Sequence, residues 1–153
     1  MSFIIRPFER KYARYFRQLN EAWLEKYFFV EEKDKEILEN SESYIIEKGG
    51  HIFFAEVDGQ IAGCFSFIRI DEGIYELGKM AVDQQFQGKK IGQRMMEHGI
   101  SFAQEQGWKK IILYSHSKLG PALYIYRKYG FREIQLEENT PYLRSDIKME
   151  LVL

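Results

Sequence analysis

The segment Gln87–Gly92 (Gln-Gly-Lys-Lys-Ile-Gly) combines residue types that can bind an anion. Gly88 and Gly92 allow the backbone to approach a ligand closely or to adopt a positive φ. Lys89 and Lys90 add positive charge at the same place. The residues that follow have the pattern of an amphipathic helix, and the N–H groups that open a helix have no partner within it, so they can point at a phosphate. The segment therefore predicts a phosphate-binding turn.

Two common nucleotide-binding motifs do not fit this turn. A Walker A loop requires Gly-x-x-x-x-Gly-Lys-[Ser/Thr], and a dinucleotide-binding loop requires Gly-x-Gly-x-x-Gly. Neither pattern matches Gln87–Gly92. Taken alone, the segment also fits a tight connection that carries two solvated lysines, so its assignment depends on the neighbouring sequence.

Apolar periodicity and turn residues predict the elements that must position this turn. Strands are expected over residues 3–6, 51–57, 60–70, 74–82, 110–114, 131–136 and 147–153. Helices are expected over residues 12–27, 31–39, 91–106 and 121–129, with a further helical turn around residues 45–46. This order favours an α/β (α+β) fold with a mixed, mostly antiparallel sheet of about six to seven strands flanked by helices.

Two glycine positions carry specific structural expectations. Asp58-Gly59 separates two strand-forming runs and predicts a two-residue hairpin. Gly78 lies inside an expected strand, where glycine usually marks a bulge or a close backbone approach. We therefore expect a break in the strand pairing near Gly78–Met80.

Composition limits the kind of protein. The 153 residues are 45% hydrophobic, which suits one core and a single domain over residues 1–153. The formal net charge of −1 gives no reason to expect nucleic-acid binding. With one cysteine, Cys64, no signal-peptide pattern and no apolar run of about 20 residues, a cytoplasmic protein without membrane association is expected.

Three blocks of the sequence together resemble the GNAT superfamily of N-acetyltransferases. Gln87–Gly92 occupies the register of the family's acyl-CoA loop, [Arg/Gln]-x-x-Gly-x-[Gly/Ala], although Lys90 stands where the first glycine is usual. Glu76–Val82 (Glu-Leu-Gly-Lys-Met-Ala-Val) precedes the loop. Pro121–Phe131 follows it and is similar to the family's Ala-x-x-Leu-Tyr-x-Lys-x-Gly-Phe. The resemblance covers residues 74–131 well, and residues 1–73 mainly through their order of elements.

The resemblance implies a GNAT-like fold and acetyl-CoA as co-substrate. The pyrophosphate would bind backbone amides of Gln87, Gly88, Lys89, Lys90, Ile91 and Gly92. The bulged strand would hold the pantetheine arm and the thioester carbonyl through Met80, Ala81 and Val82, with the Met80 N–H as oxyanion donor.

The same resemblance implies the catalytic groups. An alkyl ammonium with a pKa of about 10 must lose a proton before it attacks a thioester, and Glu76 matches the position of the family's base. Glu72 and Glu56 are alternatives. Tyr126 matches the tyrosine that protonates the departing thiolate. Tyr124 points to another face of its helix, as does Tyr129, and packing is their expected role.

One family contact is replaced. Leu119 stands where the family often has an asparagine that binds pantetheine, and Ser117, or else His116, is the expected substitute. The three histidines and Cys64 show no metal-ligand spacing, so no metal is expected.

The expected acceptor is a primary amine of a small molecule, peptide or protein, attacked in a ternary complex. Its binding site is expected to involve residues 8–50 and 137–145, and the acids of Glu31–Glu42 would either attract a cationic amine or form a solvated helix face. Exposed aromatic residues would suit a homodimer. A non-catalytic acyl-CoA sensor is the alternative, and a nucleic-acid module using Lys89, Lys90, Lys109 and Lys110 is disfavoured by the neutral charge.

Overall fold

The computed structural model describes residues 1–153 and contains one seven-stranded sheet in the order β1-β2-β3-β4-β5-β7-β6. The strands are β1 (Phe3–Pro7), β2 (His51–Val57), β3 (Gln60–Asp71), β4 (Ile74–Val82), β5 (Lys110–Ser115), β6 (Arg132–Ile134) and β7 (Ile147–Val152). All neighbouring strands are antiparallel except β4 and β5, which run parallel. The expected mixed, mostly antiparallel sheet is confirmed.

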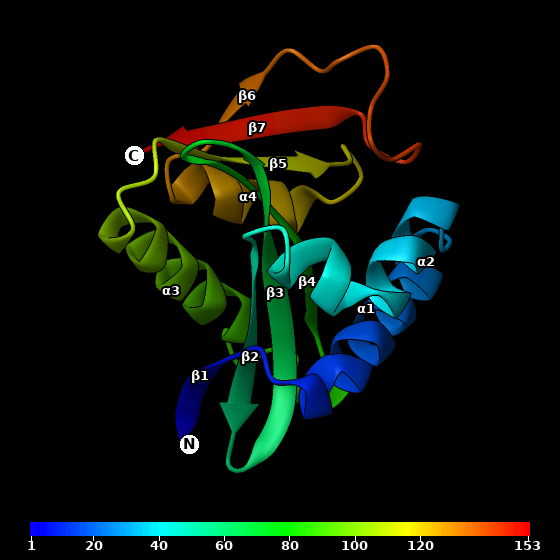
Figure 1. Ribbon diagram of the computed structural model, residues 1–153, viewed down its shortest axis with the longest axis vertical. Coiled ribbons are helices and arrows are strands. Elements are labelled where there is room, and N and C mark those ends of the chain that lie inside the picture. Colours follow the sequence, from blue (N-terminus) through cyan, green and yellow to red (C-terminus); the bar gives the residue numbers. More distant parts are fainter.

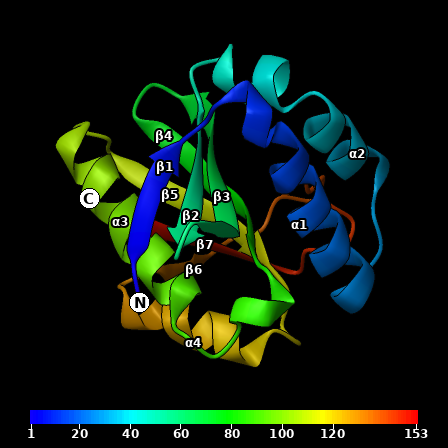
Figure 2. The same ribbon diagram turned by 90° about the horizontal axis from the view of Figure 1, so that it is seen from below.

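Helices cover both faces of the sheet (Figures 1 and 2). They are α1 (Ala13–Tyr27), α2 (Glu32–Glu39), α3 (Ile91–Glu105) and α4 (Gly120–Lys128), with short turns η1 (Arg10–Tyr12), η2 (Glu42–Ile46) and η3 (Gln84–Phe86). In both views α1 and α2 lie on one side of the strands, and α3 and α4 lie on the other. None of these helices is both long and apolar enough to cross a membrane.

The alternation of side chains along β2 shows why the sheet needs two helical layers. Phe53 and Ala55 are buried in the core beneath α3 and α4. Ile52 and Phe54 point the other way and are buried in a second core with α1 and α2. Successive side chains of a strand face opposite sides, so the four consecutive apolar residues Ile52–Ala55 must be covered on both.

The parallel pair β4 and β5 is joined over only part of its length. Residues Ile74–Glu76 pair with Lys110–Ile112, and no pairing continues beyond Glu76 although both strands do. The strands therefore separate in the middle of the sheet. This separation gives side chains from both helical layers access to the same interior space.

The turns follow the sequence expectations closely, with one difference at the edge of the sheet. Asp58 and Gly59 form the predicted hairpin with φ values of 48° and 83°. The strand expected over 131–136 is shorter, because only Arg132–Ile134 pairs with β7. Beyond this short strand, Glu137 accepts a hydrogen bond from the Tyr114 hydroxyl of β5 at 2.9 Å.

Candidate active site

The loop Gln87–Gly92 leads directly into the N-terminus of α3. Gly88 has a φ of 80°, and Lys90, at the N-cap of α3, has a φ of 59° in the left-handed region. That conformation costs a non-glycine residue about 1–2 kcal/mol. Lys90 stands where the family usually has glycine, and its backbone takes the strained conformation that glycine would favour.

Two cavities meet beside this loop. The outer cavity, of about 450 Å³, is lined by residues of the loop, the starts of α3 and α4, and the end of β4. The inner cavity, of about 110 Å³, lies between the separated strands β4 and β5. Both are lined by the same four residues, Trp23, Met80, Ala122 and Tyr126. A ligand in the outer cavity can therefore extend one end into the inner cavity.

The predicted bulge lies in β4 where the two cavities meet. Cys64 pairs with Ala81 and Ser66 pairs with Gly78, so Lys79 and Met80 together oppose one residue of β3. Lys79 has a φ of 51°. The Ser66 hydroxyl donates a hydrogen bond to the Gly78 carbonyl at 3.1 Å. The bulge turns β4 so that Met80 reaches both cavities.

Glu76 lies in the inner cavity as a buried carboxylate with only 6% of its surface exposed. The Tyr142 hydroxyl donates a hydrogen bond to its Oε2 at 3.3 Å. Burial raises the pKa of Glu76, and the positive charge of Lys79 partly opposes that rise. A carboxylate whose pKa is raised toward neutrality is better suited to accept a proton than a solvated one. Gly78, on the same face of β4, leaves the space beside this carboxylate free of a side chain.

Tyr126 reaches the junction of the two cavities from α4. Burial raises its pKa to about 12, so the hydroxyl keeps its proton at neutral pH. Tyr124, on the same helix, is 69% exposed. The two tyrosines point to different faces of α4, as the sequence predicted, but the expected packing role of Tyr124 is wrong, because its side chain is exposed to solvent. Tyr129 does pack against the core.

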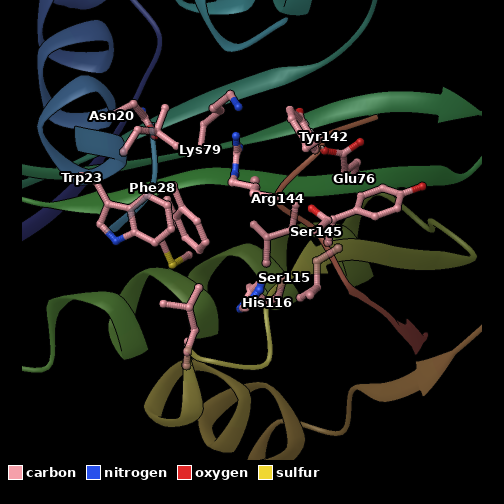
Figure 3. A pocket seen from close by; sticks show the side chains of 18 of the residues that line it. Asn20, Trp23, Phe28, Glu76, Lys79, Ser115, His116, Tyr142, Arg144 and Ser145 are labelled. Carbon is pink, nitrogen blue, oxygen red and sulfur yellow. Dashed lines mark hydrogen bonds between the residues drawn. The ribbon is translucent and has the colours of Figure 1, made fainter. Parts of the chain in front are cut away.

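A buried group of charged side chains, which we call the ion cluster, joins α2, β4 and the β6–β7 loop. Lys79 Nζ lies 2.6 Å from Asp34 Oδ1, and Arg144 donates to Asp34 at 2.7 and 3.0 Å and to Glu31 at 3.0 Å. Figure 3 shows Lys79 and Arg144 close together, with Tyr142 and Glu76 beside them. The acids Glu31 and Asp34 are therefore neither a solvated helix face nor free to attract an amine.

The pKa values of Asp34 and Lys79 reflect both their burial and the charges beside them. Burial alone would raise the pKa of Asp34, but the hydrogen bond from Arg144 and the charge of Lys79 outweigh it and lower that pKa. Burial lowers the pKa of Lys79, and the negative charge of Asp34 opposes the change. The lowered pKa of Asp34 therefore favours an ionised carboxylate between Arg144 and Lys79.

Most of the predicted site residues line one of the two cavities. Glu76 and Tyr126 line the inner one, and the outer one is lined by Met80, Ala81, Val82, Gln87, Gly88, Lys90, Ile91 and Gly92. Lys89 and Ser117 line neither. The Ser117 hydroxyl donates to Asp146 at 2.7 Å, and its neighbour His116 lines the inner cavity instead.

The alternative bases lie away from the cavities. Glu56 pairs with Arg6 at 2.6 Å, and Glu72 is exposed in the turn between β3 and β4. Neither residue lines the inner or the outer cavity.

Several lining residues were not singled out as site residues from the sequence. The sequence could have identified Lys79 as a site residue, because it is a charged residue within a largely apolar strand and beside a glycine. Tyr142 and Arg144 had no such signal, since they lie in a loop whose path over the sheet depends on tertiary contacts. That loop and α1 both contribute to the inner cavity, as was expected of the segments 8–50 and 137–145.

The fold and the two cavities define a protein with a glycine- and lysine-containing loop at a helix start and a buried carboxylate between separated parallel strands. Residues 9–131 match the family model described as Acetyltransferase (GNAT) family. The chain belongs to this family.

Relatives and solved structures agree with that assignment. The chain is 28% identical to the spermidine N(1)-acetyltransferase of Escherichia coli (strain K12) over 136 residues, 83% of this chain and 71% of the relative. It is 28% identical to the mycothiol acetyltransferase of Clavibacter sepedonicus over 82 residues, 54% of this chain and 27% of the relative. The chain spans less than half the length of the first curated relatives that it matches.

Two solved structures share the fold over nearly the whole chain. A GNAT-family acetyltransferase from Staphylococcus aureus Mu50 aligns with a TM-score of 0.84 and 26% identity, covering 97% of this chain and 98% of the other. The PaiA N-acetyltransferase of Thermoplasma acidophilum, solved in complex with coenzyme A, aligns with a TM-score of 0.79 and 19% identity over 100% of both chains. The expected GNAT-like fold is confirmed.

Proposed function

We propose that this protein is an N-acetyltransferase that moves the acetyl group of acetyl-CoA to a primary amine of a small molecule, peptide or protein. The observation that carries the proposal is the meeting of the two cavities at Met80 and Tyr126, with the buried carboxylate of Glu76 in the inner one. This arrangement suits a long anionic donor on one side and an amine on the other.

The outer cavity suits acetyl-CoA. Backbone amides of Gln87–Gly92 would bind the pyrophosphate at the start of α3, where the helix dipole favours negative charge, and Lys89 and Lys90 would add positive charge. The pantetheine arm would follow Met80–Val82 along the end of β4 toward the junction. The predicted contact of Ser117 with this arm stays a prediction, since Ser117 already binds Asp146.

In the reaction, Glu76 would take a proton from the acceptor ammonium, directly or through water. The neutral nitrogen would then attack the thioester carbonyl carbon, and the Met80 N–H would stabilise the oxyanion that forms. The C–N bond forms, the C–S bond breaks, and the nitrogen releases its second proton to water, while Glu76 later returns its own proton to solvent. Direct attack needs no acyl-enzyme. Cys64, the one thiol of the chain, is buried, and burial raises its pKa to about 12.

Tyr126 would protonate the CoA thiolate as the C–S bond breaks. Its position where the two cavities meet supports this role, because a thioester that extends from the outer cavity toward Glu76 would pass this residue. Because burial holds its pKa at about 12, Tyr126 is protonated before the reaction and recovers its proton from solvent afterwards.

Two measurements test the proposal. Calorimetry should detect binding of acetyl-CoA, and a thiol reagent should detect release of CoA when an accepted amine is added. A protein that binds acetyl-CoA but releases no thiol with any amine would be the acyl-CoA sensor instead. A protein that binds no CoA at all would overturn both functions.

The remaining sequence expectations stay predictions. They are the single domain over residues 1–153, the cytoplasmic location, the homodimer, and the absence of a metal, of nucleic acid and of a membrane as partners. Size-exclusion chromatography with light scattering would test the homodimer, and metal analysis of the purified protein would test the metal.

A further inference from the structure

The charges around the inner cavity cancel before any acceptor binds. Lys79 and Arg144 line this cavity, and their partners are Asp34 and Glu31 in α2 and at its N-cap. Two cations are thus matched by two carboxylates, and these pairs are buried, with side-chain exposures of 13% or less. Glu76 is the one lining carboxylate outside these ion pairs.

Most of the remaining wall is apolar and aromatic. Trp23 and Phe28 lie side by side, with ring centroids 5.8 Å apart, and Tyr142 lies across from them (Figure 3). The cavity has a volume of about 110 Å³. A site of this size holds a slim apolar group, since an apolar cavity of about 150 Å³ is large enough to hold benzene.

Ser115 adds one polar group that has no partner. It ends β5, lines the inner cavity, and is 7% exposed. Its hydroxyl oxygen is the one buried side-chain polar atom of the protein without a hydrogen bond. Since a buried hydroxyl without a partner costs about 1–3 kcal/mol, a ligand that supplies the partner gains that energy on binding.

We propose that the inner cavity accepts the end of a small, singly charged, largely apolar amine that carries one uncharged hydroxyl or amide group, which the Ser115 hydroxyl binds. The inference rests on the proposed acetyltransferase function and narrows its acceptor. The single ammonium is matched by Glu76. A second ammonium would be buried near Lys79 and Arg144 with no free carboxylate, and an acceptor carboxylate would find both of those cations already paired.

Four amines of equal chain length test the inference through thiol release with acetyl-CoA. They are pentylamine, aminopentanol, cadaverine and aminovaleric acid, which differ only in the group at the far end. We expect kcat/KM to be highest for aminopentanol, somewhat lower for pentylamine, and at least about tenfold lower than for pentylamine with the two charged ends. A kcat/KM for cadaverine or aminovaleric acid that equals or exceeds that for pentylamine overturns the inference.

The variant Ser115→Ala identifies the recognising group. It removes a hydroxyl that has no partner in the protein, so the fold should keep its stability. We expect kcat/KM for aminopentanol to fall to that for pentylamine, so that the preference between the two amines disappears. Ser101→Ala, at an exposed position of α3, is the matched control and should keep the preference. An equal loss of kcat/KM with both amines would mean that Ser115 contacts acetyl-CoA instead, and would overturn its role in binding the acceptor.

Failure of the inference is distinguishable from failure of the proposed function. Thiol release with a lysine peptide or with cadaverine, but not with pentylamine or aminopentanol, overturns the acceptor inference and leaves the acetyltransferase function in place. No thiol release with any of these amines overturns both.

Discussion

Lys79 Nζ lies 2.6 Å from Asp34 Oδ1, and the two side chains are 4% and 0% exposed. The pair connects the bulge of β4 to α2, two elements separated by β2 and β3 in the sequence. Lys79 also holds a left-handed backbone conformation, with a φ of 51°. A buried ion pair therefore joins the strained bulge of β4 to α2, beside the contacts that Arg144 makes with Asp34 and Glu31.

Removing the carboxylate of Asp34 should destabilise the protein strongly. In Asp34→Asn, Lys79 and Arg144 remain buried without their shared counter-charge, and we expect the free energy of unfolding to fall by about 3 kcal/mol. Urea unfolding followed by circular dichroism measures this. The control Glu21→Gln breaks the exposed Arg17–Glu21 pair and should change stability by about 0.5 kcal/mol or less. Similar effects of the two variants would contradict the importance of the buried pair.

Substitutions of Lys90 can distinguish the effect of its charge from the effect of its backbone conformation. Lys90→Gly and Lys90→Ala remove the same charge, but only glycine adopts the observed φ of 59° without strain. We expect the glycine variant to be about 1 kcal/mol more stable than the alanine variant. If backbone amides bind the pyrophosphate, calorimetry should show that Lys90→Gly keeps most of the affinity for CoA. Equal stability of the two variants would mean that the strain is absent.

Glu76 and Tyr126 should affect turnover more than binding. Glu76→Gln and Tyr126→Phe each remove a proton-transfer group while keeping its shape, so we expect kcat to fall on the order of 100-fold or more. The dissociation constant of CoA should change by no more than about threefold, or less than 1 kcal/mol. The exposed Tyr124 provides the control, since Tyr124→Phe should leave both quantities unchanged. Unchanged kcat in either active-site variant would remove that residue's assigned role.

Tyr142 should set the acid limb of the pH profile. Glu76 must be deprotonated to act as a base, so kcat/KM should rise with pH through the pKa of Glu76. That pKa lies above its ordinary value because of burial, and the hydrogen bond from Tyr142 holds it lower than burial alone would. Tyr142→Phe removes the hydrogen bond, so the acid limb should move to higher pH. A shift to lower pH, or none, would exclude this coupling.

The sequence predicted the structure around the loop Gln87–Gly92 well, because that region is built from contiguous residues. The loop Gln87–Gly92 and the glycine of the bulge, Gly78, carry local signals in residue type and spacing. The hairpin at Asp58-Gly59 was predictable for the same reason. Strand ends were less so, as β6 shows, since its length is set by its pairing with the distant strand β7.

The residues that form the inner cavity are brought together only by the tertiary structure. The inner cavity is formed by α1, the bulge of β4, the end of β5 and the β6–β7 loop, which come from all parts of the chain. The acids at Glu31 and Asp34 were identified in the sequence, but their partner Arg144 lies more than a hundred residues away. Charge pairing between such distant residues follows from the path of the chain in space rather than from any local pattern.

The sequence by itself thus determined the order of the elements, the bulge of β4 and the loop that leads into α3, because hydrophobic periodicity, glycine and helix starts act over a few residues. Only the tertiary structure decided that Lys90 takes a left-handed conformation, that Glu76 is buried beside Tyr142, and that the acids of α2 are neutralised. These properties depend on burial and on charges brought together from distant segments, and both exist only once the sheet and its helices have assembled.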